Sequence, residues 1–251
     1  MSAAVEQVRP GVYRRPDGLV NSYLVTDDDG LTIIDTGWPR SWSRVEQAIA
    51  AIGRSLNDLR AVVLTHGHPD HLGVAEKARQ RCRVPVRAHR DEVERVRGKA
   101  KGASPFALVP GLLPHLWRPS ATAFVLHATR NGFMTPTWVR EVSPFDDGEE
   151  LAVPGKPRAV LTPGHTEGHT AFHLPDRGVL LSGDALVTLD VLSREKGPRL
   201  LPDALTSDPA GARASLQRLE PLEADLVLPG HGEPWSGTPA DAVAQARAAD
   251  R

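Results

Sequence analysis

The 251-residue chain has almost no cysteine, no excess of either charge and no long apolar run. Its single cysteine, Cys82, excludes a disulfide framework, and we expect a packing residue there although Arg81 and Arg83 flank it. No apolar run approaches the length of a membrane span, and residues 1–10 lack the apolar core of a signal peptide. These absences predict a cytoplasmic protein without a membrane partner.

The charge balance argues against another class of partner. Thirty basic residues face 31 acidic ones, which gives a formal net charge of -1. No electrostatic reason therefore exists to expect nucleic acid or an anionic surface as the main partner. Hydrophobic residues make up 40% of the chain, which is enough for a substantial core in one large α/β domain or two small ones.

Strand and helix patterns alternate through the first hundred residues. Residues 19–26 and 31–34 predict a hairpin around the turn 27–30, and residues 41–52 have the apolar spacing of a helix. A strand over 59–64, a helix over 72–81, a short strand over 84–88 and a helix from 90 to 96 follow. This alternation indicates helices that cover a sheet.

The stretch Thr65 to Gly73 carries the densest chemistry of the chain. His66, His68, Asp70 and His71 fall within six residues directly after an apolar strand. Because His66 and His68 are two apart, both rings can point to one side of the backbone, whereas Asp70 and His71 lie where a helix would begin. The stretch can therefore serve two nearby metal ions, and its imidazole and carboxylate donors suit zinc, iron or manganese.

Three later strands end in the same way. The apolar segments 159–161, 178–181 and 225–228 each lead to a glycine followed at once by His165, Asp184 or His231. If these strand ends gather at one sheet edge, seven ligands converge on two ions. Asp184 could then bridge the ions, because its two oxygens can each reach one of two cations about 3.5 to 4 Å apart.

Other polar residues near these motifs have different interpretations. Asp35 follows a strand and could either cap the next helix or orient a metal-bound histidine. His169 is predicted to support the site or bond to backbone, because Gly168 and the following strand pattern disfavour a metalloprotease helix. His173 is expected to be structural, and His115 and His127 to be ordinary surface or packing residues.

Residues 98–145 are rich in proline and glycine and yet apolar. One interpretation is a lid or insert that walls the mouth of the active site with apolar groups. The other is a satellite core or a homodimer contact. As a lid, the segment would favour a small-molecule substrate with an acyl or aromatic portion.

The ligand order resembles a known family. The run from His66 to His71, followed by His165, Asp184 and His231, is similar to the metallo-β-lactamase superfamily and to its glyoxalase II-like hydrolase branch. The Asp35-Thr36-Gly37 stretch and residues 163–170 match the same pattern. The resemblance implies an α/β fold, an αββα four-layer sandwich, formed by a single domain over 1–251 with an insert at about 98–145.

The resemblance also implies the ligand sets. His66, His68 and His165 would bind the first metal, Asp70, His71 and His231 the second, and Asp184 would bridge them. Only twenty residues follow His231, which argues against the glutathione-binding region of glyoxalase II. Val187 stands where the related homoserine lactonases have a tyrosine, and the Asp70-His71 pair together with Asp184 disfavours a true β-lactamase.

These observations predict a dinuclear hydrolase of esters, thioesters or lactones. Two divalent ions, with zinc expected and iron or manganese as alternatives, would activate a bridging hydroxide, and Asp70 would accept or orient its proton. The principal alternative is a mononuclear iron dioxygenase that acts on persulfides. A non-catalytic binding protein braced by metal is less favoured, because structural zinc sites are usually closed by four ligands.

Overall fold

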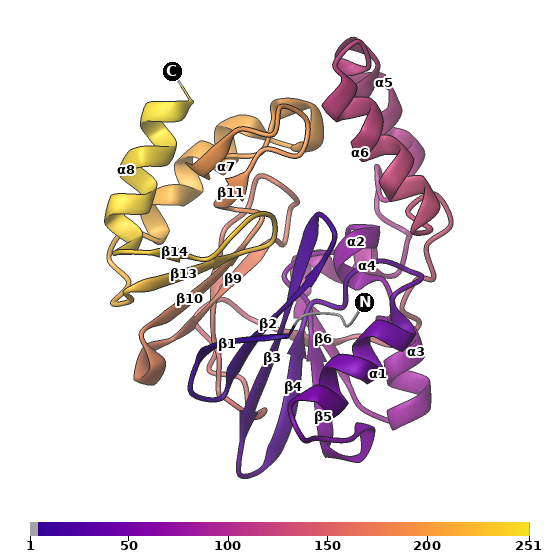
Figure 1. Ribbon diagram of the computed structural model, residues 1–251, viewed down its shortest axis with the longest axis vertical. Helices are drawn as coiled ribbons and strands as arrows, with labels where there is room; N and C mark the ends of the chain where they lie inside the picture. Colours follow the sequence, from indigo (N-terminus) through magenta and orange to yellow (C-terminus); the bar gives the residue numbers. More distant parts are fainter. Residues whose placement is uncertain (1–4, 251) are drawn as a thin grey trace.

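The computed structural model describes residues 5–250, and its centre is two β-sheets packed face to face (Figure 1). The seven-stranded sheet runs in chain order through β1 (Glu6–Arg9), β2 (Val12–Asp17), β3 (Val20–Asp27), β4 (Gly30–Ile34), β5 (Leu59–Val63), β6 (Val86–His89) and β7 (Ser143–Phe145). The five-stranded sheet has the order β14 (Trp235–Ser236), β13 (Leu226–Pro229), β10 (Val179–Gly183), β9 (Thr170–Leu174) and β8 (Arg158–Leu161). A separate hairpin pairs β11 (Val187–Leu189) with β12 (Lys196–Arg199).

Helices cover the outer face of each sheet. The helices are α1 (Trp42–Ala51), α2 (Pro69–Leu72), α3 (Ala75–Cys82), α4 (Val93–Val96), α5 (Val109–Leu112), α6 (Pro119–Arg130), α7 (Pro209–Ser215) and α8 (Pro239–Ala249). The apolar face of α1, with Val45 and Ile49, packs with α3 on the first sheet, and Val243 of α8 packs on the second. The order helix, sheet, sheet, helix is the expected αββα sandwich.

The space between the sheets holds the central core. Strand residues such as Tyr23 and Val63 of the first sheet meet Phe172, Leu181 and Leu228 of the second, and all five are buried. Each of these strands also sends alternate side chains outward to its helix layer, which is the two-residue period of a strand. Both sheets are therefore apolar on both faces and positioned rigidly against each other.

Strand direction brings the sequence motifs together. Strands β4 and β5 are parallel, and β10 is parallel to β13. Strand β9 is antiparallel to both β8 and β10, so β8, β10 and β13 share one direction. Their carboxyl ends consequently lie at the same edge of the second sheet, where the predicted ligands follow each strand.

Most expected elements are present, but some boundaries differ. The strand expected over 84–88 begins at Val86, and the helix expected over 72–81 begins at Ala75 as α3, because Gly73 and Val74 separate it from α2. A Cβ on Gly73 would lie 1.8 Å from the carbonyl oxygen of Gly37, so the chain there is pressed against the backbone that follows β4. This contact between distant segments breaks the helix, and the local apolar pattern cannot reveal it.

Residues 98–145 combine several structures. They contain α5 and α6, which lie together beside the sandwich (Figure 1), and they end in β7 at the edge of the first sheet. Phe124, Ala128 and Phe133 form an apolar cluster with Val191 and Leu205 of the body. The segment therefore has its own small core on top of the sandwich.

Two sequence expectations can be compared directly with the structure. Cys82 is half-buried against the first core and burial raises the pKa of its thiol, which agrees with a packing role. Within residues 5–250, none of the helices combines the length and apolar character that crossing a membrane requires.

The inter-sheet core gives a stability prediction. Phe172→Ala should lower the free energy of unfolding by about 3 to 5 kcal/mol, because it leaves a cavity between two sheets that cannot close around it. Phe106→Ala is the matched control, because the Phe106 side chain is 64% exposed. This substitution should lower the free energy of unfolding by no more than about 0.5 kcal/mol. Chemical denaturation of both variants measures the difference, and equal losses would contradict this description of the core.

Candidate metal centre

Seven buried imidazole and carboxylate groups meet where the strands of both sheets end. His66 and His68 lie in the loop after β5, and α2 carries Asp70 and His71. The other three follow strands of the second sheet: His165 after β8, Asp184 after β10 and His231 after β13. All seven side chains predicted from the sequence to be ligands are buried and close together.

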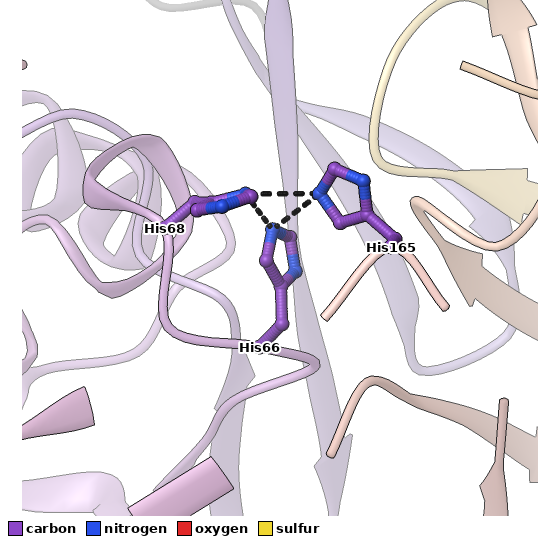
Figure 2. Close-up of side chains that lie close together, drawn as sticks. All are labelled: His66, His68 and His165. Atoms are coloured by element: carbon purple, nitrogen blue, oxygen red, sulfur yellow. Dashed lines mark hydrogen bonds between the residues drawn. The ribbon is translucent and has the colours of Figure 1, made fainter. Parts of the chain in front are cut away.

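Three histidine rings point to one place (Figure 2). The Nε2 atom of His66 lies 3.0 Å from Nδ1 of His68 and 3.2 Å from Nε2 of His165. The third edge of this triangle, from His165 Nε2 to His68 Nδ1, is 2.9 Å. Zinc with nitrogen ligands at about 2.0 to 2.1 Å in a tetrahedron separates those nitrogens by roughly 3.3 Å, so the triangle is close to the size of a metal site.

A second group faces this triangle. Asp70 Oδ2 lies 3.8 Å from His71 Nε2 and 3.7 Å from His231 Nε2. These distances are too long for hydrogen bonds. The three atoms instead surround a space that a metal ion could occupy. Asp70, His71 and His231 therefore form a second group with the composition of a metal site.

Asp184 lies between the two groups. Its Oδ2 atom is 3.5 Å from His165 Nε2 and 3.1 Å from His231 Nε2, whereas Oδ1 is 3.5 Å from His71 Nε2. Among the described residues, buried His71 Nε2 and Asp184 Oδ1 have no hydrogen-bond partner. Buried polar atoms without partners are costly, and a cation between them would satisfy both.

The electrostatics of the two groups differ. Burial, followed by neighbouring histidines, holds the pKa of His66 and His68 well below the usual value. Burial also lowers the pKa of His165 to about 3. These three rings are consequently neutral at pH 7, which is the form of imidazole that binds metals.

The second group favours positive charge. Burial opposes a proton on His71 and His231, but nearby carboxylates, Asp184 first, outweigh it and raise the pKa of both rings. Burial likewise opposes charge on Asp184, and these two histidines nevertheless hold its pKa well below the usual value. Burial raises the pKa of Asp70. A field that stabilises protons at these rings would also stabilise a metal cation.

Asp35 orients one of these histidines. Its Oδ2 atom lies 2.8 Å from His71 Nδ1, and its carboxylate also accepts hydrogen bonds from the backbone N–H and hydroxyl of Thr65. Helix α1 begins later, with Ser41 at its N-cap, so Asp35 does not cap it. Of the two interpretations of Asp35, the structure favours the one in which it orients a site histidine.

His169 also supports the cluster, as the sequence predicted. Its Nε2 atom accepts a hydrogen bond from the backbone N–H of Asp184 at 2.9 Å, and Nδ1 lies 2.8 Å from the Thr162 hydroxyl. His173 bonds the carbonyl of Glu223 on the far side of the sheet and is structural. Gly230 lets Asp184 approach, since a Cβ at position 230 would lie 2.0 Å from Asp184 Oδ1.

Glu92 is a supporting residue that the sequence motifs did not predict. Its buried carboxylate accepts hydrogen bonds from the backbone N–H groups of Gly67 and Gly168 at 2.8 Å and from the Thr166 hydroxyl at 2.9 Å. Burial raises the pKa of Glu92 to about 7 in spite of Arg95 and these donors. Glu92 thus ties the His66-Gly67-His68 loop to the loop that begins with His165.

An apolar cavity of about 180 Å³ opens onto the cluster. His68, Asp70, His165, Asp184 and His231 are part of its lining. Apart from Thr129, the rest of the lining is apolar and comes from residues 105–134 and 191–205. A small molecule can therefore reach the buried ligands from a water-poor, apolar side.

The Glu92 contacts give a prediction about folding. Glu92→Ala should lower the free energy of unfolding by about 3 kcal/mol or more, because three buried donors lose their acceptor. Glu94→Ala is the matched control, because the exposed Glu94 carboxylate pairs with Arg97 at the surface. This substitution should lower the free energy of unfolding by less than about 1 kcal/mol. Denaturant unfolding separates the two, and similar values for both variants would be inconsistent with this role of Glu92.

Comparison with known proteins agrees with this geometry. Residues 15–231 match the family model described as the metallo-beta-lactamase superfamily. The chain is 30% identical to the probable metallo-hydrolase YflN of Bacillus subtilis, over 94% of this chain and 89% of that protein. It is 27% identical to hydroxyacylglutathione hydrolase GloC of Haemophilus influenzae, over 84% and 85%.

A solved structure shows the same fold. The metallo-beta-lactamase family protein TTHA1429 of Thermus thermophilus matches with a TM-score of 0.67 and 28% identity, over 96% of this chain and 79% of that one. The family match covers β3 to β7 of the first sheet, β8, β9, β10 and β13 of the second, and all seven clustered ligand-type residues. The chain therefore belongs to the metallo-beta-lactamase superfamily.

Proposed function

We propose that this protein is a dinuclear metal-dependent hydrolase that cleaves an ester, thioester or lactone bond. The observation that carries this proposal is the pair of buried ligand groups, with Asp184 between them, at the end of an apolar cavity. His66, His68 and His165 would hold one ion, and Asp70, His71 and His231 the other. Asp184, with Oδ2 near His165 and Oδ1 near His71, would contribute to both sites.

Zinc is the expected metal, because five imidazoles and two carboxylates match its preferred donors; iron and manganese are alternatives. Bound divalent ions would lower the pKa of a shared water and polarise a carbonyl oxygen. Asp70, the proposed catalytic residue, accepts or orients the proton of that water, since its carboxylate faces the space between His71 and His231. Asp35 and Glu92 hold the two histidine loops in position.

The surrounding side chains support attack by water rather than by the protein. Ser182 lies next to the cluster in strand β10, and its buried hydroxyl donates to the carbonyl of Leu186 at 2.6 Å. Cys82 lies on the outer helix α3. The name of GloC, a hydroxyacylglutathione hydrolase, favours acyl substrates for this chain as well. Glutathione itself has less support, because α8, the helix after His231, packs on the second sheet rather than beside the cavity.

The rival activities have less support. A mononuclear iron dioxygenase would leave one ligand group without an ion, although both groups are buried and both carry unsatisfied or charged atoms. A metal that only braced the fold would not need a cavity beside it. We also propose that residues 98–145 are an insert within a single domain that walls the site; a homodimer contact through its exposed Trp117 remains a second role for this segment.

Asp184→Ala tests the bridging role. This variant should lose at least one metal equivalent, and its hydrolytic rate should fall by more than the roughly 10- to 100-fold that loss of an outer partner costs. Elemental analysis and a screen of esters, thioesters and lactones provide the two measurements. The same samples should show no oxygen uptake with a persulfide.

Asp176→Ala is the control, because Asp176 is an exposed carboxylate in the turn before β10. It should keep both metals and full activity. An Asp184→Ala protein with two bound metals and full activity would refute the bridging assignment.

A further inference from the structure

The cavity beside the metal centre differs from the rest of the site in its chemistry. Apart from the five ligand-type residues, its wall is formed by apolar side chains and Thr129, and no further charged side chain of the described residues lines it. A charged guest would lose its hydration there without gaining a partner. The part of a substrate that enters this cavity is therefore uncharged and apolar.

Helix α6 supplies a large part of the apolar cavity wall. Phe124, Val125, Ala128 and Thr129 line it, and these positions form one face of the helix over more than a full turn. Leu112 of α5 belongs to the same lining. From Phe124 to Thr129 this apolar wall spans about 7.5 Å along the helix axis, which is long enough for an extended chain of several carbons.

The size of the cavity limits the length of that chain. A volume of about 180 Å³ admits about six non-hydrogen atoms at roughly 30 Å³ each, the share of a liquid water molecule, and about twelve at roughly 15 Å³ each, the space of one water-sized probe. The five ligand-type residues form one compact patch of the lining, so the reacting bond of the guest must lie at that patch. The remaining atoms then extend between α6 and the body.

We propose that the cavity is an acyl-chain pocket that selects unbranched, uncharged acyl groups of about six to ten carbons, with their carbonyl at the metal centre. This inference rests on the proposed hydrolase and adds its substrate class. Hydrolysis breaks the bond between the acyl carbon and the leaving oxygen or sulfur. Water supplies the hydroxyl of the released carboxylic acid and the proton of the released alcohol or thiol.

A series of straight-chain acyl esters with one constant alcohol tests the length selection. From four carbons upward, kcat/KM should rise about fourfold per added methylene, because each methylene leaves water for the apolar wall. The rise should end near eight to ten carbons. A flat profile from two to twelve carbons would overturn the proposal.

A second series keeps the acyl group as acetate and lengthens the alcohol. Little dependence on alcohol length is expected, because the pocket holds the acyl side. If kcat/KM instead rose about fourfold per methylene of the alcohol and not of the acyl group, the cavity would hold the leaving group. That result would also overturn the proposal.

Ala128→Leu tests the location. Ala128 is buried, lines the cavity and gains three carbons in this variant, so the ratio of kcat/KM for ten-carbon to four-carbon esters should fall by about tenfold or more. Ala123→Leu makes the same change at an exposed position of α6 outside the cavity and should keep the wild-type profile. An unchanged ratio in a folded Ala128→Leu protein would contradict the assignment.

Calorimetric titration with straight-chain 1-alkanols separates this inference from the hydrolase proposal. Affinity should rise about fourfold per methylene up to the same length, and Ala128→Leu should abolish the rise for the longer members. Length-dependent binding without hydrolysis of any ester would retain the pocket and refute the hydrolase. Hydrolysis of esters without any dependence of rate or binding on chain length would retain the hydrolase and refute the acyl-chain pocket.

Discussion

The burial of five imidazoles and two carboxylates in one small space is the constraint on which the rest of this structure depends. Groups of this kind are costly to bury unless they are paired with each other, with hydrogen-bond donors or with a cation. Here the histidine nitrogens point at one another across about 3 Å, and Asp184 Oδ1 faces His71 Nε2 without a hydrogen bond. Two cations in this space would compensate the free-energy cost of burying these groups.

The sandwich supplies the rigidity that such a cluster needs. Two apolar sheets are held between helix layers, and their strand ends carry the ligands from segments far apart in the chain. Outer contacts then fix each ring: Asp35 holds His71, the carbonyl of Leu19 lies 2.5 Å from Nδ1 of His231, and Glu92 joins the loops of His66 and His165. The ligand positions are thus determined by the fold rather than by the metal alone.

Local patterns predicted helices that cover a sheet and all seven clustered residues, whereas the αββα sandwich was implied by the family resemblance. Strand ends followed by glycine and a ligand type can be recognised without knowing the tertiary structure. Glu92 could not be found in this way, since its partners Gly67 and Gly168 come from distant loops. The break at Gly73 and the helices of residues 98–145 also depend on contacts with other segments. The family resemblance contributed the pairing of ligands into two sets, which spacing alone left open.

The most direct test of the dinuclear centre is the metal content per chain of protein purified without added metal or chelator. About two equivalents of zinc, or of manganese, are expected, because two ligand groups share Asp184. Protein that contains no metal after such a preparation, or a single equivalent of iron, would contradict the dinuclear hydrolase. The iron result would instead favour oxygen-dependent chemistry on a persulfide.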